Sequence, residues 1–339
     1  MKKLVDWVTN HQVVAFFILA FAITWGLGFS YGEVIKKNNF YLAPLVFVAT
    51  CGPALAGIII SALTNTQSVK TPRKAFWLAF VLGWIISALV FFAYFTLING
   101  MPLSLMMTVL TLVSVLPVAF VLGCSHSRNP GVSQYLSSLT RLRGVWGWAL
   151  LALAFNPLLM LLTMGISSLP GRETFSMPRL PVSGLALVVV IIVKFLYQWF
   201  FFNATGEEAG WRGFVQNRLQ VKLSPLVALL IMGFFWPIWH FFLWQAEGSP
   251  VTSPQWWAQQ YLALIPATVF ITWFYNRSKG SILVAGAAHA SANTAFFFFQ
   301  NLDLLVFNVS VGVVAIVMIL IDKMWKKLPA DHPAVYRSE

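Results

Sequence analysis

Residues 182–202 read VSGLALVVVIIVKFLYQWFFF, and two adjacent carboxylates, Glu207 and Glu208, follow within a few residues. A helix needs about 20 apolar residues to cross the hydrocarbon core of a bilayer. Comparable runs recur along the whole chain, so we expect ten spans, an all-α fold and a polytopic transmembrane helical bundle. The expected spans are 13–33, 41–64, 75–98, 103–124, 146–169, 182–202, 223–244, 257–276, 281–300 and 303–321.

The composition agrees with a membrane protein. Of 339 residues, 59% are hydrophobic and only 9% are charged. Soluble domains carry about 25% charged residues, and disordered chains carry still more, so both classes are excluded. The net charge of +12 would suggest a nucleic-acid partner in a soluble protein, but membrane proteins concentrate Lys and Arg in cytoplasmic loops. We therefore expect membrane lipids as partners, and no nucleic acid.

The distribution of basic residues predicts the orientation. With the N-terminus inside, four of the 22 Lys and Arg residues fall in outer segments, namely Lys36, Lys37, Arg172 and Arg179. Lys194 lies within a span, and the remaining 17 lie in inner segments. Because Lys and Arg favour the cytoplasmic side, this bias predicts that both termini are cytoplasmic.

Three charged residues follow the apolar run 199–202 at membrane depth. Arg212 comes four residues after Glu208, so a helix would place the two on one face as an ion pair. Glu207 would then point about 100° away and remain available as a base. The simpler alternative is an interfacial helix end where all three side chains are solvated.

Further polar side chains interrupt two other apolar segments. His240 ends the sequence WPIWH at 236–240, and His289 and Asn293 lie four apart in AAHASAN at 287–293. That spacing puts His289 and Asn293 on one helix face, and the small residues around them allow close helix packing. Polar side chains inside a membrane mark functional sites, although a lone His is often only an interhelical hydrogen-bond partner. Lys194 shows no obvious partner in the sequence.

These side chains suit hydrolysis without a covalent nucleophile. A carboxylate can activate water, an imidazole can share the proton, and Asn with neutral His can stabilise an oxyanion. Zinc is the alternative, with Glu207, His240 and His289 as candidate ligands. The sequence has no HExxH box and Asn is a poor zinc ligand, so we expect no metal and no other cofactor.

At these positions the sequence resembles the CPBP family of intramembrane proteases. That family includes the type II CAAX prenyl endopeptidases and bacterial bacteriocin-processing, immunity and lysostaphin-resistance relatives. Its pattern is Glu-Glu-x-x-x-Arg, Phe-x-x-x-His and His-x-x-x-Asn on three helices, and the chain matches it at 207–212, 236–240 and 289–293. The departure is Trp236 in place of Phe, which makes Trp236 a candidate residue of the substrate cleft. The resemblance covers about 180–300.

The resemblance implies roles for the six matched polar residues. They are Glu207 as the water-activating base with His240 as its partner, Glu208 and Arg212 as site-orienting residues, and His289 with Asn293 as oxyanion-stabilising residues. It further implies a multi-pass integral protein of the bacterial cell (inner) membrane. The expected activity is endoproteolysis of a membrane-associated protein or peptide, with prenylated CAAX proteins as one substrate class.

Two other functions are compatible with the same residues. One is a non-catalytic immunity or scaffold protein of the same fold, and the other is a proton-coupled transporter with a buried relay. The protease is favoured because every matched polar position is intact and because the sequence shows no internal repeat.

The division of the chain follows from the motif positions. We expect N-terminal transmembrane helices at 1–145, a protease core at 146–302, and a last transmembrane helix with a basic cytoplasmic tail at 303–339.

The expected spans place two key residues far apart. A seventh span starting at Leu223 puts His240 about 25 Å along that helix, whereas Glu207 lies near the inner end of the sixth span. We therefore predict that the sixth helix continues, buried, past Glu207 to about Gln216. We also predict a water-filled cavity around Glu207, because buried charge needs partners.

Overall fold

The computed structural model describes residues 2–65, 73–169, 183–299 and 303–337. Within these ranges every regular element is a helix, which confirms the all-α class. The first half contains α1 (Lys2–Asn10), α2 (Gln12–Gly26), α3 (Phe29–Lys37), η1 (Phe40–Leu42), α4 (Ala43–Thr50), α5 (Gly52–Thr64), α6 (Arg73–Leu97), α7 (Leu105–Ser114), α8 (Leu116–Cys124), α9 (Pro130–Leu136) and η2 (Ser137–Leu139). The second half contains α10 (Trp146–Ser167), α11 (Leu185–Gln198), η3 (Trp199–Glu208), η4 (Trp211–Gln216), α12 (Asn217–Lys222), α13 (Pro225–Trp239), α14 (Phe241–Ala246), α15 (Pro254–Arg277), α16 (Ile282–Phe298) and α17 (Leu304–Ile321).

Several helices have the dimensions of membrane spans. Among the described residues, six are long and apolar enough: Gln12–Lys37, Arg73–Leu97, Leu105–Cys124, Trp146–Ser167, Leu185–Lys222 and Pro225–Ala246. The pair Phe40–Thr50 and Gly52–Thr64, bent by 52°, gives a seventh if it is one broken span. The chain is therefore a polytopic helical membrane protein.

The ten crossings and the cytoplasmic termini stay predictions. The apolar helices α16 and α17 are shorter than the six, and α15 covers the expected span at 257–276. Three basic residues used in the orientation argument, Lys70, Arg172 and Arg179, lie outside the described residues.

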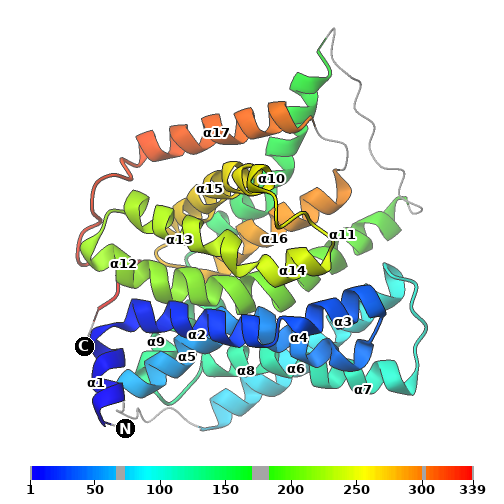
Figure 1. Ribbon diagram of the computed structural model, residues 1–339, viewed down its shortest axis with the longest axis horizontal. Coiled ribbons are helices and arrows are strands. Elements are labelled where there is room, and N and C mark those ends of the chain that lie inside the picture. Colours follow the sequence, from blue (N-terminus) through cyan, green and yellow to red (C-terminus); the bar gives the residue numbers. More distant parts are fainter. Residues whose placement is uncertain (1, 66–72, 170–182, 300–302, 338–339) are drawn as a thin grey trace.

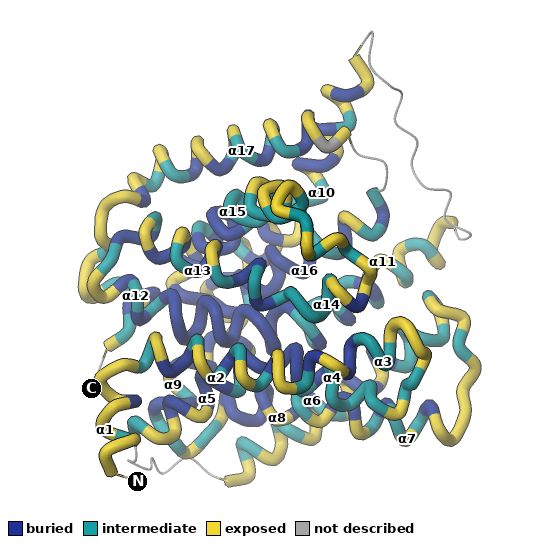
Figure 2. The backbone as a smooth tube through the Cα atoms, viewed as in Figure 1, coloured by how far each residue is buried: buried dark blue, intermediate teal, exposed yellow. Residues whose placement is uncertain are grey.

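The sixth span is longer than its apolar run. The helix runs from Leu185 to Lys222 over 38 residues and does not end at residue 202. The expected boundary of the sixth span is therefore wrong, and the predicted continuation of the helix past Glu207 is confirmed. Figure 1 shows this long element crossing the middle of the molecule, with α2 and α5 on one side and α13 and α16 on the other. Nearly all side chains of η3 and η4 are buried, as the dark blue centre of Figure 2 shows. The polar residues from Asn203 to Gln216 therefore lie inside the protein rather than against lipid.

Two stretches of this helix, η3 and η4, are π-helical. The wider π turn breaks the regular pattern of backbone bonds, and such turns are common at functional sites. Here two side chains bond to carbonyls of η3: the hydroxyl of Thr205 donates to the Phe200 carbonyl, and that of Thr50 donates to the Phe201 carbonyl at 3.3 Å. The bonds help to satisfy the backbone of η3 and tie it to α4.

Small residues allow other helices to approach the long helix closely. A Cβ added to Gly210 would lie 2.4 Å from the backbone carbon of Pro53 in α5. On another side, a Cβ added to Gly286 of α16 would lie 2.4 Å from the Cβ of Ala204. Beyond α16, Asn156 of α10 donates to the Ala288 carbonyl at 2.8 Å. These contacts fix α16, and with it His289, against the long helix.

Gly210→Ala is expected to lower the free energy of unfolding by about 1–3 kcal/mol, since the added methyl overpacks against backbone that cannot rotate away. Thermal unfolding in detergent would measure the change. Gly165→Ala in α10 is the matched control, because nothing lies within 4 Å of a Cβ added there. Equal melting temperatures for the two variants would contradict the close packing of α5 on the long helix at Gly210.

Candidate active site

The two neighbouring carboxylates have different partners. Glu208 is fully buried, and both of its oxygens lie 3.0–3.1 Å from Nη1 of Arg212. The ion pair expected from the sequence is therefore confirmed. The sequence-based alternative of a solvated helix end does not hold, because Glu207 and Arg212 are also buried.

Glu207 points to a different set of side chains. Its Oε2 accepts a hydrogen bond of 2.6 Å from the indole Nε1 of Trp236 and lies 3.6 Å from Nε2 of His240. The distance of 3.6 Å is too long for a direct hydrogen bond, but it suits two groups that share a water molecule. Glu207 therefore keeps one oxygen fixed by an uncharged donor and faces an imidazole.

His240 lies at a break between two helices, and its side chain points toward Glu207. α13 contains Pro237 and ends at Trp239, and α14 starts at Phe241, so His240 forms the junction. Its Nδ1 lies 2.9 Å from the Trp236 carbonyl. A carbonyl only accepts, so the proton is assigned to Nδ1, and Nε2 of the neutral ring is an acceptor that faces Glu207.

His289 is held by the buried ion pair. Its Nδ1 lies 2.8 Å from Oε1 of Glu208, so Nδ1 carries the proton that it donates to that carboxylate. In the neutral ring Nε2 then has no hydrogen to donate. The sequence analysis expected Asn293 and neutral His289 to donate hydrogen bonds to an oxyanion. With this tautomer only Asn293 can do so, because Nε2 of His289 has a hydrogen to donate only when the ring is an imidazolium.

Asn293 has a partner that the sequence reasoning missed. Its Nδ2 donates to Oδ1 of Asn203 at 3.3 Å, which leaves its second N–H for another acceptor. Asn203 is completely buried four residues before Glu207. Its position directly after the run at 199–202 was an available signal, since a polar side chain at membrane depth is a functional candidate.

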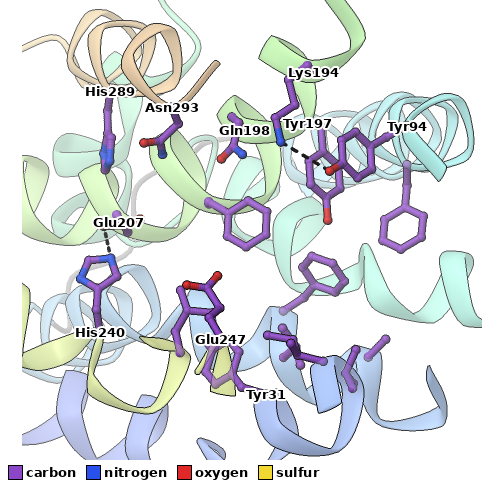
Figure 3. A pocket seen from close by; sticks show the side chains of 18 of the residues that line it. Tyr31, Tyr94, Lys194, Tyr197, Gln198, Glu207, His240, Glu247, His289 and Asn293 are labelled. Atoms are coloured by element: carbon purple, nitrogen blue, oxygen red, sulfur yellow. Dashed lines mark hydrogen bonds and ion pairs between the residues drawn. The ribbon is translucent and has the colours of Figure 1, made fainter. Parts of the chain in front are cut away.

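Four of the predicted residues share one cavity. Glu207, His240, His289 and Asn293 line a space of about 840 Å³, and Trp236, expected in the substrate cleft, lines it too. Figure 3 shows Glu207, His240, His289 and Asn293 gathered at one side of this cavity. The two site-orienting candidates, Glu208 and Arg212, are buried and are not among its lining residues. The predicted cavity is present, and its water content stays a prediction.

The walls of the cavity come from both halves of the chain. Tyr31 of α3, Phe47 of α4, Phe91 of α6 and Met107 of α7 line it together with residues of α11, α13, α15 and α16. The site therefore needs residues from the expected N-terminal segment 1–145 as well as from the expected core 146–302. The boundaries of those three segments stay predictions.

The candidate zinc ligands do not form a metal-binding group. In the described part of the chain, no three His, Cys, Asp or Glu side chains are clustered closely enough to hold a metal ion. His289 directs Nδ1 to Glu208, and His240 directs Nδ1 to a backbone carbonyl. Zinc thus has no set of converging ligands here, and the metal-free expectation remains to be tested by chelation.

Sequence comparison agrees with the motif and its geometry. Residues 184–295 match the family model described as type II CAAX prenyl endopeptidase Rce1-like. Over this segment the chain resembles the Rce1-like family. It contains all six matched polar residues, from Glu207 to Asn293, so the family recognised from the motif is confirmed.

One curated protein is similar to part of this chain. "CAAX prenyl protease 2" of Methanococcus maripaludis is 33% identical to this chain over 95 residues. The alignment covers 26% of this chain and 35% of that protein, so the chain spans about a third of the relative's length.

Proposed function

We propose that the protein is an intramembrane endopeptidase that hydrolyses a peptide bond with water activated by Glu207. The proposal rests on the placement of Glu207 and His240, 3.6 Å apart, in a cavity of about 840 Å³ lined mainly by apolar side chains. The match to the Rce1-like family supports protease activity at the level of the family. Its substrate would be a membrane-associated protein or peptide, with prenylated CAAX sequences as one class, cut near the cytoplasmic leaflet of a bacterial inner membrane.

The first step would be attack by water. A water molecule bound to both Oε2 of Glu207 and Nε2 of His240 donates one hydrogen to each acceptor, which raises the electron density on its oxygen. As that oxygen bonds to the peptide carbonyl carbon, its proton passes to Glu207. The Trp236 N–H keeps the carboxylate oriented throughout.

The second step would be collapse of the tetrahedral intermediate. The free N–H of Asn293 donates to the oxyanion, and Nε2 of His289 would be a second donor if it carried a hydrogen. Cleavage of the C–N bond follows, and the proton held by Glu207 or His240 moves to the leaving nitrogen. The second hydrogen of the water also reaches the leaving nitrogen through these acceptors, so the products are a new carboxylate and a new ammonium group, and Glu207 and His240 return to their starting state.

Glu208 and Arg212 would act as positioning residues. Neither lines the cavity, but Glu208 fixes both the ring orientation and the tautomer of His289. Nη1 of Arg212 lies 3.0–3.1 Å from both oxygens of Glu208 and so holds that carboxylate in place, and loss of Arg212 would therefore disturb His289 indirectly.

The proposal is tested by incubating the reconstituted protein with prenylated and plain CAAX peptides in H₂¹⁸O under single-turnover conditions. Mass spectrometry should show cleavage with one ¹⁸O in the new carboxylate, and a chelator should leave the rate within about twofold because no metal takes part. An unlabelled first-turnover product would show that an enzyme carboxylate attacks directly. Abolition by the chelator, with recovery on adding Zn²⁺, would replace the metal-free mechanism. No cleavage by the folded protein would favour the scaffold or the transporter.

A further inference from the structure

A second, much smaller cavity adjoins Glu207. It has a volume of about 20 Å³ and shares Tyr31, Glu207 and His240 with the main cavity. Three polar residues that do not line the main cavity complete its wall, namely Thr24, Thr50 and Trp239. A cavity needs roughly 10–15 Å³ to hold one water molecule, so this space accommodates a single water and is too small for a peptide side chain.

The threonines and the tryptophan in this wall already have hydrogen-bond partners. Nε1 of Trp239 donates to the Thr24 hydroxyl at 2.8 Å, and that hydroxyl donates to the Ala49 carbonyl at 2.7 Å. The Thr50 hydroxyl donates to backbone carbonyls of α4 and η3 at 3.0 and 3.3 Å. The donors of these three side chains are therefore used within the protein, and they close the cavity on the side of α2 and α4.

Tyr31 is different, because its hydroxyl has no hydrogen-bond partner in the described part of the chain. Its side chain is only 2% exposed and packs with Ala49 and Ala246, and Figure 3 shows it on the same side of the main cavity as His240. A buried tyrosine hydroxyl usually has a partner, since an unpaired polar group is unfavourable away from bulk water. The hydroxyl offers one hydrogen, whereas Glu207 and Nε2 of His240 are acceptors. One water molecule satisfies all three groups, because it accepts one hydrogen bond and donates two.

We propose that the small cavity binds one water molecule through Tyr31, Glu207 and His240, and that this water attacks the peptide bond. A peptide that fills the apolar main cavity displaces the mobile water there, but it cannot enter the small cavity. The reactant therefore stays beside Glu207 when the substrate is bound, with one lone pair directed at the peptide carbonyl carbon. Tyr31 is a positioning residue that α3 contributes from outside the matched segment 184–295. The water's role as nucleophile rests on the proposed proteolysis, whereas its binding does not.

Tyr31→Phe removes only the hydroxyl and should lower kcat for peptide cleavage by about tenfold, the equivalent of one lost hydrogen bond. KM should stay within about twofold, because the hydroxyl holds water and not the peptide. Tyr41→Phe is the matched control, since Tyr41 is 70% exposed and should leave both constants within about twofold. An unchanged kcat in Tyr31→Phe, or a higher KM with the same kcat, would overturn the role of Tyr31. Thermal unfolding of the same preparations would verify that both variants fold.

A crystallographic measurement keeps this proposal separate from the catalytic one. Electron density of wild-type protein, at a resolution that shows ordered water, should contain one water about 2.7–3.2 Å from the Tyr31 hydroxyl, Glu207 and Nε2 of His240. The same peak should be weak or absent in Tyr31→Phe. Wild-type density without this water would overturn the proposal whether or not a peptide is cleaved, and an equal peak in Tyr31→Phe would overturn the role of Tyr31. The expected peaks without any cleavage would support the water site and contradict the proposed proteolysis.

Discussion

Glu207→Gln is expected to lower kcat/KM for peptide cleavage by about 10²–10⁴, the usual contribution of a general base. The amide oxygen of Gln can still accept the hydrogen bond from Trp236, so the side chain should keep its place. What the variant lacks is a group that takes a proton from water. Rates measured by mass spectrometry, with thermal unfolding of the same preparations, would separate catalysis from folding.

The matched control for this variant is Glu33→Gln. Glu33 pairs with Lys37 on the surface of α3, outside the site, so the same chemical change should leave the cleavage rate within about twofold. Equal cleavage by wild type and Glu207→Gln would show that Glu207 is not the base.

Arg212→Met is expected to lower the free energy of unfolding by about 3–5 kcal/mol, because it leaves the Glu208 carboxylate buried without its cation. Arg212 is 1% exposed and also lies 5.5 Å from the ring centroid of Trp236, so its loss removes packing as well. Activity should fall together with stability, since Glu208 holds His289. Chemical or thermal unfolding in detergent and the peptide assay would report the two effects.

A second substitution makes this prediction specific to charge. The double variant Glu208→Gln with Arg212→Met removes both charges, so it should be more stable than Arg212→Met alone while remaining poorly active. Arg277→Met is the surface comparison, because Arg277 is half-exposed where it pairs with Asp322 and should contribute at most about 1 kcal/mol. A double variant no more stable than the single one would show that packing, not the ion pair, explains the loss.

Local periodicity was enough to predict part of the site. The spacing of Glu208 and Arg212 on a helix predicted their ion pair. The spacing of His289 and Asn293 predicted a shared helix face, and both residues line one cavity. These relations hold within one turn of a helix, where the backbone fixes which side chains are neighbours. The family was recognised from the same residues, and its model covers them.

The contacts between helices could not be predicted in this way. The bond from Trp236 to Glu207 and the bond from Asn293 to Asn203 join residues 29 and 90 positions apart. The end of the sixth span was misplaced for a related reason. Hydropathy measures transfer into lipid, and residues after 202 are surrounded by protein instead, since Gly206 lies against Thr50 and Gly210 lies against Pro53. The same reasoning missed Asn203, whose partner lies on another helix.

The length of the site helix has a consequence for where a bond can be cut relative to the bilayer. Its apolar part, Leu185 to Phe202, has 18 residues and extends about 27 Å, nearly the thickness of a hydrocarbon layer. Glu207 follows that part within five residues, so hydrophobic matching of the helix to the lipid would place Glu207 close to the boundary between acyl chains and headgroups. If the proposed proteolysis holds, bilayer thickness would help to determine which bond of a substrate reaches Glu207. A substrate need insert only its end below the headgroups to bring the bond to the carboxylate.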